Sequence, residues 1–210
     1  MGHVPHLLVP GPWAGEHLDL TAEQKHHLEN VLRIGDGEPA TYTDGAGSFG
    51  QGRYARGGLA RDRESRVPAP SDLIMVVAPP DNRHRARFMV EKLSELGVAE
   101  LRFLDTRHRQ GRLPHSGKVL SWAVSGLEQS RGAWLMKTSD RLATFADLST
   151  PFVVCDQGGT RVTPLARTVV IGPEGGWGSD EVPGDAMRWD LGDTVLRVET
   201  AALVAAARIL

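Results

Sequence analysis

From residue 72 onward the chain alternates between short apolar runs and amphipathic segments, and this alternation constrains the fold more than any other feature. Residues 73–78 form a continuous apolar run, as expected of a strand buried on both faces. Residues 84–96 place apolar side chains, including Phe88 and Leu96, at helical spacing, and Gly97 can end that helix. Further strands are expected at 101–104, 152–155, 168–171 and 195–197, with helices at 119–129 and from residue 200 onward. The alternation predicts an α/β domain with a largely parallel sheet.

The first 66 residues follow a different pattern, in which glycine separates short β segments. Residues 40–43 and 48–54 flank an Asp-Gly turn at Asp44 and Gly45, which is typical of a hairpin. A short helix is expected at 21–32, with Thr21 as N-cap. The charged segment 61–71, which contains prolines and no periodicity, indicates a linker. We therefore expect a small β domain at residues 1–66 and the α/β domain at 72–210.

Composition limits the class of protein. The chain has 210 residues, of which 40% are hydrophobic, and it can bury an ordinary core. Its apolar runs are too short to span a bilayer, and its first residues do not resemble a signal peptide. The single cysteine excludes an internal disulfide, and the histidines lack metal-ligand spacing. We expect a cytoplasmic protein with no metal and no membrane partner.

A net charge of −2 argues against a protein that coats nucleic acid nonspecifically, but it conceals a local excess of positive charge. Between residues 83 and 112 lie eight basic residues against four acidic ones. The basic residues are Arg83, Arg85, Arg87, Lys92, Arg102, Arg107, Arg109 and Arg112. A basic region on an acidic body is typical of a protein that binds phosphate at one place, although an ordinary solvated surface explains the charge equally well.

The expected strand 168–171 ends in a loop of sequence Gly-Pro-Glu-Gly-Gly-Trp at 172–177. Glycine lets backbone amides and carbonyls approach a ligand closely. The loop lacks the Gly-Lys-Ser/Thr of a phosphate cradle and carries an acid instead. It favours a polar, cationic ligand without phosphate, although such a loop can equally be a tight turn. A helix start is expected at Ser179–Glu181, where acidic residues follow a serine.

A second motif, Leu-Gly-x-x-x-Leu-Arg-x-Glu-Thr-Ala, begins at Leu191. It places Arg197 and Glu199 at an expected strand-to-helix junction, where Glu199 or Thr200 can cap the helix. On its own, this motif is as well explained by an ordinary Arg–Glu pair beside a capping threonine.

Together the two motifs resemble the C-terminal signature of the RsmE family. Three further segments match the family's motifs in the same order along the chain. Residues 27–37 resemble His-x-x-x-Val-Leu-Arg-x-x-x-Gly, residues 91–98 resemble Gln-Lys-x-x-Glu-Leu-Gly-Val, and residues 128–130 are Glu-Gln-Ser. The matches cover nearly the whole chain.

The resemblance implies a PUA-like RNA-binding β-barrel followed by a SPOUT α/β domain with a deep trefoil knot. It implies an S-adenosylmethionine-dependent homodimer that methylates N3 of a specific uridine in 16S ribosomal RNA, within the small ribosomal subunit. The implied cofactor residues are Gly172, Pro173, Glu174, Gly175, Gly176, Leu191, Gly192, Leu196 and Thr200. The implied RNA contacts are Arg33, Arg85, Arg107, Arg109 and Arg131.

The implied reaction needs a deprotonated or electrostatically stabilised uracil, because N3 carries a proton at neutral pH. Arg197 can stabilise the developing anion, and Glu199 or Glu174 can act as base or orient the substrate. We expect Arg197 and Glu199 to be the catalytic residues. For Arg197 the competing interpretation is a structural ion pair with Glu199.

The sequence departs from the family pattern at several positions. His3 and His6 stand where the family has arginines, Gly132 and Met136 replace an arginine and a proline, and Pro183-Gly184 interrupts the segment after the glycine loop. Two alternatives stay open, and the departures at His3, His6 and Gly132 support only the first. One is a non-catalytic RNA-binding or ribosome-assembly protein that keeps the fold, and the other is a SPOUT methyltransferase acting on another RNA.

Overall fold

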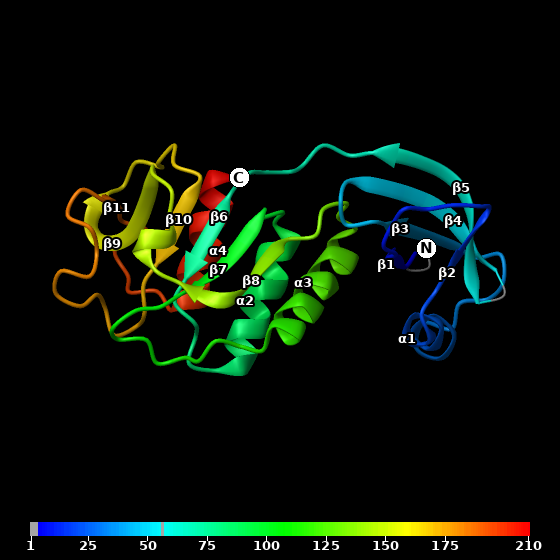
Figure 1. Ribbon diagram of the computed structural model, residues 1–210, viewed down its shortest axis with the longest axis horizontal. Coiled ribbons are helices and arrows are strands. Elements are labelled where there is room, and N and C mark those ends of the chain that lie inside the picture. Colours follow the sequence, from blue (N-terminus) through cyan, green and yellow to red (C-terminus); the bar gives the residue numbers. More distant parts are fainter. Residues whose placement is uncertain (1–3, 56) are drawn as a thin grey trace. The chain divides into compact units, whose positions relative to one another are not determined.

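The computed structural model describes residues 4–55 and 57–210, and the chain forms two compact units (Figure 1). The first unit contains residues 1–69 and 127–135, and the second contains residues 70–126 and 136–210. The segment 127–135, which the sequence placed inside the α/β domain, therefore clusters with the β unit. The boundaries at residues 66 and 72 remain a proposal. His3 lies outside the described residues.

The first unit is built on a five-stranded sheet with the order β1-β3-β4-β5-β2. Its strands are β1 (His6–Leu8), β2 (His17–Asp19), β3 (Pro39–Thr43), β4 (Ser48–Ala55) and β5 (Gly58–Arg66). β1 pairs with β3 in parallel, and the other pairs are antiparallel. A core of aliphatic residues with Tyr42 and Tyr54 packs on one face of this sheet.

A short helix lies between β2 and β3, as the sequence predicts. It consists of α1 (Ala22–His26) and a π-helical turn, η1 (His27–Val31). Thr21 is the N-cap, and its side chain and that of Gln24 accept hydrogen bonds from each other's backbone amides. Leu28 anchors the helical segment in the core of the first unit.

The prediction of a linker at 61–71 is wrong for its first half, because β5 extends to Arg66. Residues 61–66 pair only with β4, and their side chains are mostly exposed. A strand with both faces exposed to solvent does not bury every second side chain. Its sequence therefore lacks the alternation of apolar and polar residues by which a strand is recognised.

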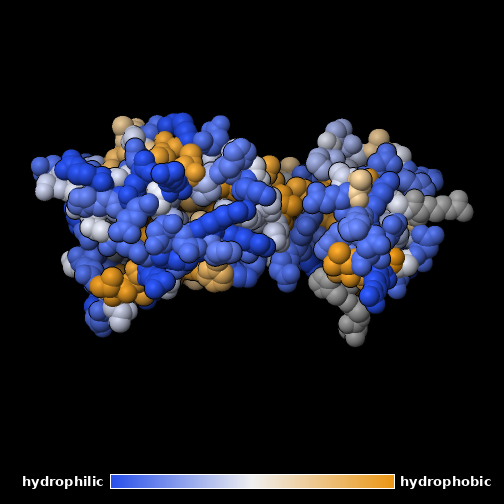
Figure 2. Space-filling view, turned by 90° about the horizontal axis from the view of Figure 1, so that it is seen from below, coloured by the Kyte–Doolittle hydropathy of each residue, from blue (hydrophilic) through white to orange (hydrophobic). Residues whose placement is uncertain are grey.

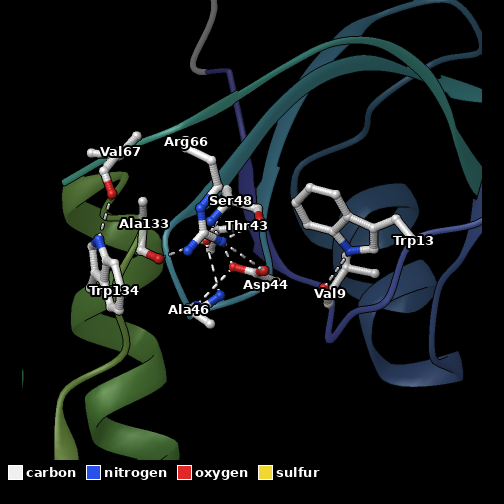
Figure 3. Close-up of polar contacts among 11 residues, drawn as sticks. Val9, Trp13, Thr43, Asp44, Ala46, Ser48, Arg66, Val67, Ala133 and Trp134 are labelled. Carbon is white, nitrogen blue, oxygen red and sulfur yellow. Dashed lines mark hydrogen bonds and ion pairs between the residues drawn. The ribbon is translucent and has the colours of Figure 1, made fainter. Parts of the chain in front are cut away.

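The Asp-Gly turn between β3 and β4 is held by a network within the first unit (Figure 3). The carboxylate of Asp44 accepts hydrogen bonds from the amides of Ala46 and Ser48, at 2.8 and 2.9 Å. The carbonyl of Ala133 accepts the amide of Gly47 at 2.8 Å, and Trp134 donates its indole N–H to the carbonyl of Val67. These bonds explain how residues 133–134 belong to the first unit.

His6, expected to replace an RNA-contacting arginine, is a buried structural residue of the first unit. Its ring bonds the hydroxyl of Thr41 at 2.8 Å and the carbonyl of Gly132 at 2.9 Å, and it stacks on Phe49. Burial lowers the pKa of the His6 imidazole, and the nearby charge of Arg131 lowers it further, although the Gly132 carbonyl opposes them. Two departures from the family pattern, His6 and Gly132, are therefore in direct contact.

The second unit is an α/β domain whose six-stranded sheet has the order β11-β9-β10-β6-β7-β8, with every pair parallel. Its strands are β6 (Ile74–Val77), β7 (Glu100–Leu104), β8 (Lys137–Ala143), β9 (Phe152–Thr160), β10 (Thr168–Ile171) and β11 (Met187–Trp189). Its helices are α2 (Arg83–Glu95), α3 (Ser116–Ser130, whose last residues belong to the first unit), the 3₁₀ turn η2 (Phe145–Asp147) and α4 (Val198–Ile209). The predicted parallel α/β domain is confirmed.

Helix α2 begins at the N-cap Asn82 and ends before Gly97, as expected, but of its predicted apolar pattern only Leu93 is buried. The buried residues are Ala86, Met89, Val90, Leu93 and Ser94. Phe88 and Leu96 are 47% and 40% exposed, because their positions lie beside the buried stripe rather than on it.

The face of the molecule in Figure 2 is mostly hydrophilic, with hydrophobic residues in separate patches. Every helix in the described ranges is too short or too polar to cross a bilayer.

Two predictions near the C-terminus are wrong. Residues 195–197 form no strand, and the apolar pattern there is misleading because Val195 is 85% exposed rather than buried in a sheet. Ser179–Glu181 is a turn rather than a helix start, since Asp180 adopts a left-handed φ of 59° and Pro183 follows. Helix α4 begins at Val198, with Arg197 in the N-cap position.

Candidate functional site

A cavity of about 250 Å³ lies where β9 and β10 end in the second unit, and we call it the loop cavity. Its walls are the end of β9, the loop after β10, the segment 190–196 and the first turn of α4. The strand order reverses next to this cavity. β7 and β8 extend the sheet on one side of β6, whereas the later strands β10 and β9 extend it on the other side (Figure 1). Ligands of parallel α/β sheets bind at the carboxyl ends of strands where the strand order reverses.

Gly172 forms the floor of the loop cavity together with Trp177. A Cβ atom on Gly172 would lie 2.6 Å from the Trp177 ring, which is far too close. Trp177 is fixed from its other side by Phe145, with ring centroids 5.7 Å apart. The glycine is required because the loop folds back on itself and places an aromatic ring against its own backbone.

The segment 190–196 forms the opposite wall. The amide of Asp190 donates to the carbonyl of Thr160 at 2.8 Å, which ties the segment to the end of β9. The carboxylate of Asp190 accepts the amide of Gly192 at 2.9 Å, and this bond lowers the pKa of the Asp190 carboxyl. Gly192 has a φ of 136°, a conformation that side chains disfavour. The positive φ at this position therefore explains why the motif has glycine there.

The lining of the loop cavity combines apolar surface with carboxylates. Ile171, Leu191, Leu196 and Val198 supply apolar contacts. The acids Asp156, Glu174 and Asp190 line the cavity, each paired with an arginine outside the lining, and no lysine or arginine lines the cavity itself among the described residues. Such walls suit a ligand with a flat apolar ring and a positive charge, and they disfavour phosphate.

Cys155 also lines the loop cavity, in the middle of β9 and beside Ile171, the last residue of β10. Burial raises the pKa of the Cys155 thiol to about 12. A thiol in this state stays protonated at neutral pH and is a poor nucleophile. Cys155 therefore contributes shape to the cavity rather than covalent chemistry.

Arg85 of α2 connects Glu174 and Glu199, the acids of the two C-terminal motifs. Its guanidinium donates two hydrogen bonds to Glu199, at 2.9 and 2.7 Å, one to Asp81 at 2.6 Å and one to Glu174. The side chains of Arg85 and Glu199 are only 16% and 11% exposed. Burial raises the pKa of the Glu199 carboxyl, but the hydrogen bonds and charge of Arg85 outweigh this effect, so the net pKa is lowered. Sequence analysis assigned Arg85 to RNA and did not link it to either acid.

Arg197 is close to the loop cavity but is not part of its walls, which include its neighbours Leu196 and Val198. Its side chain makes no hydrogen bond or ion pair within the described ranges, and its charge is the smallest of the named influences that lower the pKa of Glu199. The structural alternative for Arg197, an ion pair with Glu199, is therefore wrong, because Glu199 is paired with Arg85.

Most of the sequence-predicted cofactor residues meet in the loop cavity. Gly172, Pro173, Glu174, Gly176, Leu191, Gly192 and Leu196 line it. Gly175 instead faces His108, whose Cβ would lie 3.2 Å from an added Cβ, and Thr200 is exposed on α4. Thr200 also does not cap α4, since the N-cap is Arg197. Sequence analysis missed Trp177 and Asp190, which only the folded loops bring to the cavity.

The remaining arginines predicted to bind RNA are spread over both units. In the second unit, Arg107 donates to the Ser179 carbonyl at 3.0 Å and Arg109 to Asp105 at 2.7 Å. In the first unit, Arg33 and Arg131 both adopt left-handed φ values, 55° and 56°. Arg131 donates to the carbonyl of Val4, and both side chains are exposed.

Comparisons with known proteins bear on the whole chain. The family model of the RNA methyltransferase domain matches residues 67–210. A search of curated protein sequences found no match.

Solved structures match over nearly the full length. A probable rRNA methyltransferase from Porphyromonas gingivalis has 25% identity and a TM-score of 0.83, covering 98% of this chain and 97% of its own. Ribosomal RNA small subunit methyltransferase E from Neisseria gonorrhoeae, solved with S-adenosylmethionine, has 21% identity and a TM-score of 0.85, covering 99% and 97%. A Legionella pneumophila protein, also in complex with S-adenosylmethionine, has 22% identity and a TM-score of 0.84, covering 99% and 97%. These likenesses establish the fold of both units.

Proposed function

This chain belongs to the RsmE family of RNA methyltransferases, with a SPOUT α/β domain and an N-terminal β domain, and from this premise we propose that it methylates N3 of a specific uridine in 16S ribosomal RNA. The methyl donor in this proposal is S-adenosylmethionine, which is bound in the similar structures from Neisseria gonorrhoeae and Legionella pneumophila. The small ribosomal subunit is the proposed partner, and the cytoplasm is the proposed location.

The observation that carries the proposal is the lining of the loop cavity. S-adenosylmethionine has an adenine ring and a sulfonium cation but no phosphate, and the apolar and acidic walls match this chemistry. We assign its binding to Gly172, Pro173, Glu174, Gly176, Leu191, Gly192 and Leu196, which line the cavity, and retain Gly175 as support for the loop. When bound, the cofactor supplies the methyl group.

The protein's own part in the reaction is to present an unpaired uracil and to favour loss of its N3 proton. N3 pairs with adenine in a duplex, so the base must be unpaired or flipped out. We propose that Arg197, whose guanidinium has no partner in the described part of the chain, stabilises the uracil anion as it forms.

Glu199 is better suited to hold Arg85 than to accept the substrate proton. A carboxylate with a lowered pKa and two hydrogen bonds from a guanidinium is a weak base. We propose that the pair fixes Glu174 at the cavity wall, so that α2 and the glycine loop keep their places. Arg85 then acts as a positioning residue rather than a phosphate contact.

Three further features are proposed on the basis of the family resemblance. They are the trefoil knot, the PUA-like nature of the β domain and a homodimer. Phe88 and Leu96 of α2 are partly exposed apolar residues that a homodimer could cover. Arg33, Arg107, Arg109 and Arg131 are the proposed RNA contacts.

Calorimetric titration of the purified protein with S-adenosylmethionine tests the cofactor assignment. We expect saturable binding of one cofactor per chain, and S-adenosylhomocysteine, the product, should compete with it. A folded protein that binds neither molecule would support the alternative of a non-catalytic RNA-binding protein.

A further inference from the structure

The basic stretch between residues 83 and 112 contains two kinds of cation. Five of its basic residues each have a carboxylate partner at a distance of 2.6–2.7 Å; they are Arg85, Arg87, Lys92, Arg102 and Arg109. Arg107 donates to a backbone carbonyl. Arg83 and Arg112, like Arg107, have no ion pair within the described ranges, so these three residues carry the excess positive charge of the stretch.

Arg83 and Arg112 line the same cavity, which has a volume of about 510 Å³ and is distinct from the loop cavity. Lys118, a third cation without an ion pair among the described residues, lies on the same wall with His115. We call this space the arginine cavity. Its walls come from the start of α2, the start of α3 and the loop 110–114, all within the second unit.

The floor of the arginine cavity is apolar. Ala86, Leu113 and Trp122 line it, and Trp122 is 5% exposed. The one acid in the lining, Asp81, accepts a hydrogen bond from Arg85 at 2.6 Å and is outnumbered by the three cations of the same cavity. A cavity with an apolar, aromatic floor and a rim of unpaired cations fits a ligand that has a flat base and a phosphate.

The two cavities share one guanidinium as a support. Arg85 bonds Asp81, which lines the arginine cavity, and Glu174, which lines the loop cavity. Both cavities lie in the second unit and are linked by this one side chain, as a polynucleotide that occupies both with neighbouring nucleotides would require.

We infer that the arginine cavity binds a nucleotide of the single-stranded RNA that flanks the methylated uridine, with Arg83, Arg112 and Lys118 on its phosphates. The inference rests on the proposed function and adds a substrate subsite to it. Trp122 and Leu113 form the apolar surface for the base.

The test compares two triple variants in fluorescence anisotropy with a labelled single-stranded RNA of roughly a dozen nucleotides. Arg83→Gln, Arg112→Gln and Lys118→Gln remove the cations of the arginine cavity. Lys137→Gln, Arg141→Gln and Arg167→Gln remove one lysine and two arginines elsewhere on the same unit and serve as the charge-matched control.

We expect the arginine-cavity variant to lose RNA affinity by on the order of 10-fold, with a salt dependence reduced by about two ion equivalents for three lost contacts. The control should stay near wild type, and affinity for S-adenosylmethionine should be unchanged in both variants. RNA carrying 4-thiouridine should cross-link to the peptide 110–122 in the wild type.

Equal RNA affinity of the two triple variants, or cross-links confined to other peptides, would overturn the inference. Tight binding of inorganic phosphate without any effect of the variants on RNA would also overturn it and indicate a simple anion site. Failure of the proposed function has a different signature, in which the wild type binds RNA through this cavity but neither binds S-adenosylmethionine nor transfers a methyl group.

Discussion

At the scale of single residues, the pairing of Arg85 with Glu199 assigns separate tasks to the two charged residues of the C-terminal motif. Sequence placed Arg197 and Glu199 side by side and left open whether they pair with each other. The fold brings Arg85 from α2 to Glu199, a residue 114 positions away, and leaves Arg197 without an ion pair in the described ranges. A sequence cannot reveal such a partner, because the contact depends on how α2 packs against α4.

Replacement of Arg197 by alanine tests the proposed catalytic cation. Arg197→Ala should lower kcat by roughly 100-fold, as loss of one group that stabilises a developing anion does, with little change in Tm or in cofactor affinity. Arg197→Lys should recover part of the rate, and Arg208→Ala, an exposed arginine of the same helix, is the control. A variant that melts much earlier but turns over normally when cold would show that Arg197 is structural.

Glu199 makes a prediction about stability. Glu199→Gln removes the charge that holds the mostly buried guanidinium of Arg85, and we expect a loss of about 1–3 kcal/mol in the free energy of unfolding. Glu91→Gln, which breaks the more exposed pair with Arg87, should cost less than about 1 kcal/mol. Chemical denaturation of the two variants measures the difference, and equal losses would contradict the positioning role.

The same residue predicts a pH dependence. The folded protein lowers the pKa of Glu199, so its contribution to stability is present above the pKa of the unfolded chain and is lost as pH falls through the lower folded value. Between neutral pH and about pH 3, wild type should therefore lose more stability than Glu199→Gln. Parallel acid-unfolding curves for the two proteins would mean that this carboxyl does not titrate with unfolding.

At the scale of elements, the sequence predicted those strands that are buried on both faces. β6, β7, β9 and β10 read as apolar runs because helices or loops cover both sides of the sheet. β8 and β11, at the sheet edges, are largely exposed and carry polar residues, so they were missed. Helix α2 was placed correctly, but its buried face was shifted, since Phe88 and Leu96 are exposed apolar residues that sequence alone cannot distinguish from core.

The candidate site was predictable to the extent that it depends on local backbone. Gly172 and Gly192 stand where a close ring contact and a positive φ require them, and both motifs reach the loop cavity. Gly175 and Thr200, chosen from the motif pattern alone, lie outside its lining. Asp190 and Trp177 could be assigned only after the two loops were seen to face each other.

The glycine loop makes a prediction of its own. Gly172→Ala should displace Trp177 and weaken binding of S-adenosylmethionine by about 10-fold or more, because overpacking at a tight contact costs typically 1–3 kcal/mol. Gly184→Ala, in the next turn, adds a Cβ that meets no atom within 4 Å and is the matched control. Circular dichroism verifies folding, and calorimetry showing equal affinity for the two variants would remove Gly172 from the site.

At the scale of the whole molecule, the chain joins a β unit to a parallel α/β unit, and each has its own hydrophobic core. Both units match the RsmE structure from Neisseria gonorrhoeae in a single full-length alignment at 21% identity. The departures from the family pattern change only local structure. His6 and Gly132 bond each other in the first unit, and Pro183 lies in a turn of the second unit. They leave the loop cavity intact.

The most direct measurement of the central claim is nucleoside mass spectrometry of small-subunit ribosomal RNA. The purified protein is incubated with isotope-labelled S-adenosylmethionine and with small subunits or naked 16S RNA from a strain that lacks the gene. We predict that the label appears in 3-methyluridine at a single position in the RNA, and that Arg197→Ala strongly reduces it. Label in any other nucleoside, or no label in RNA when the cofactor is bound, would contradict the proposed function.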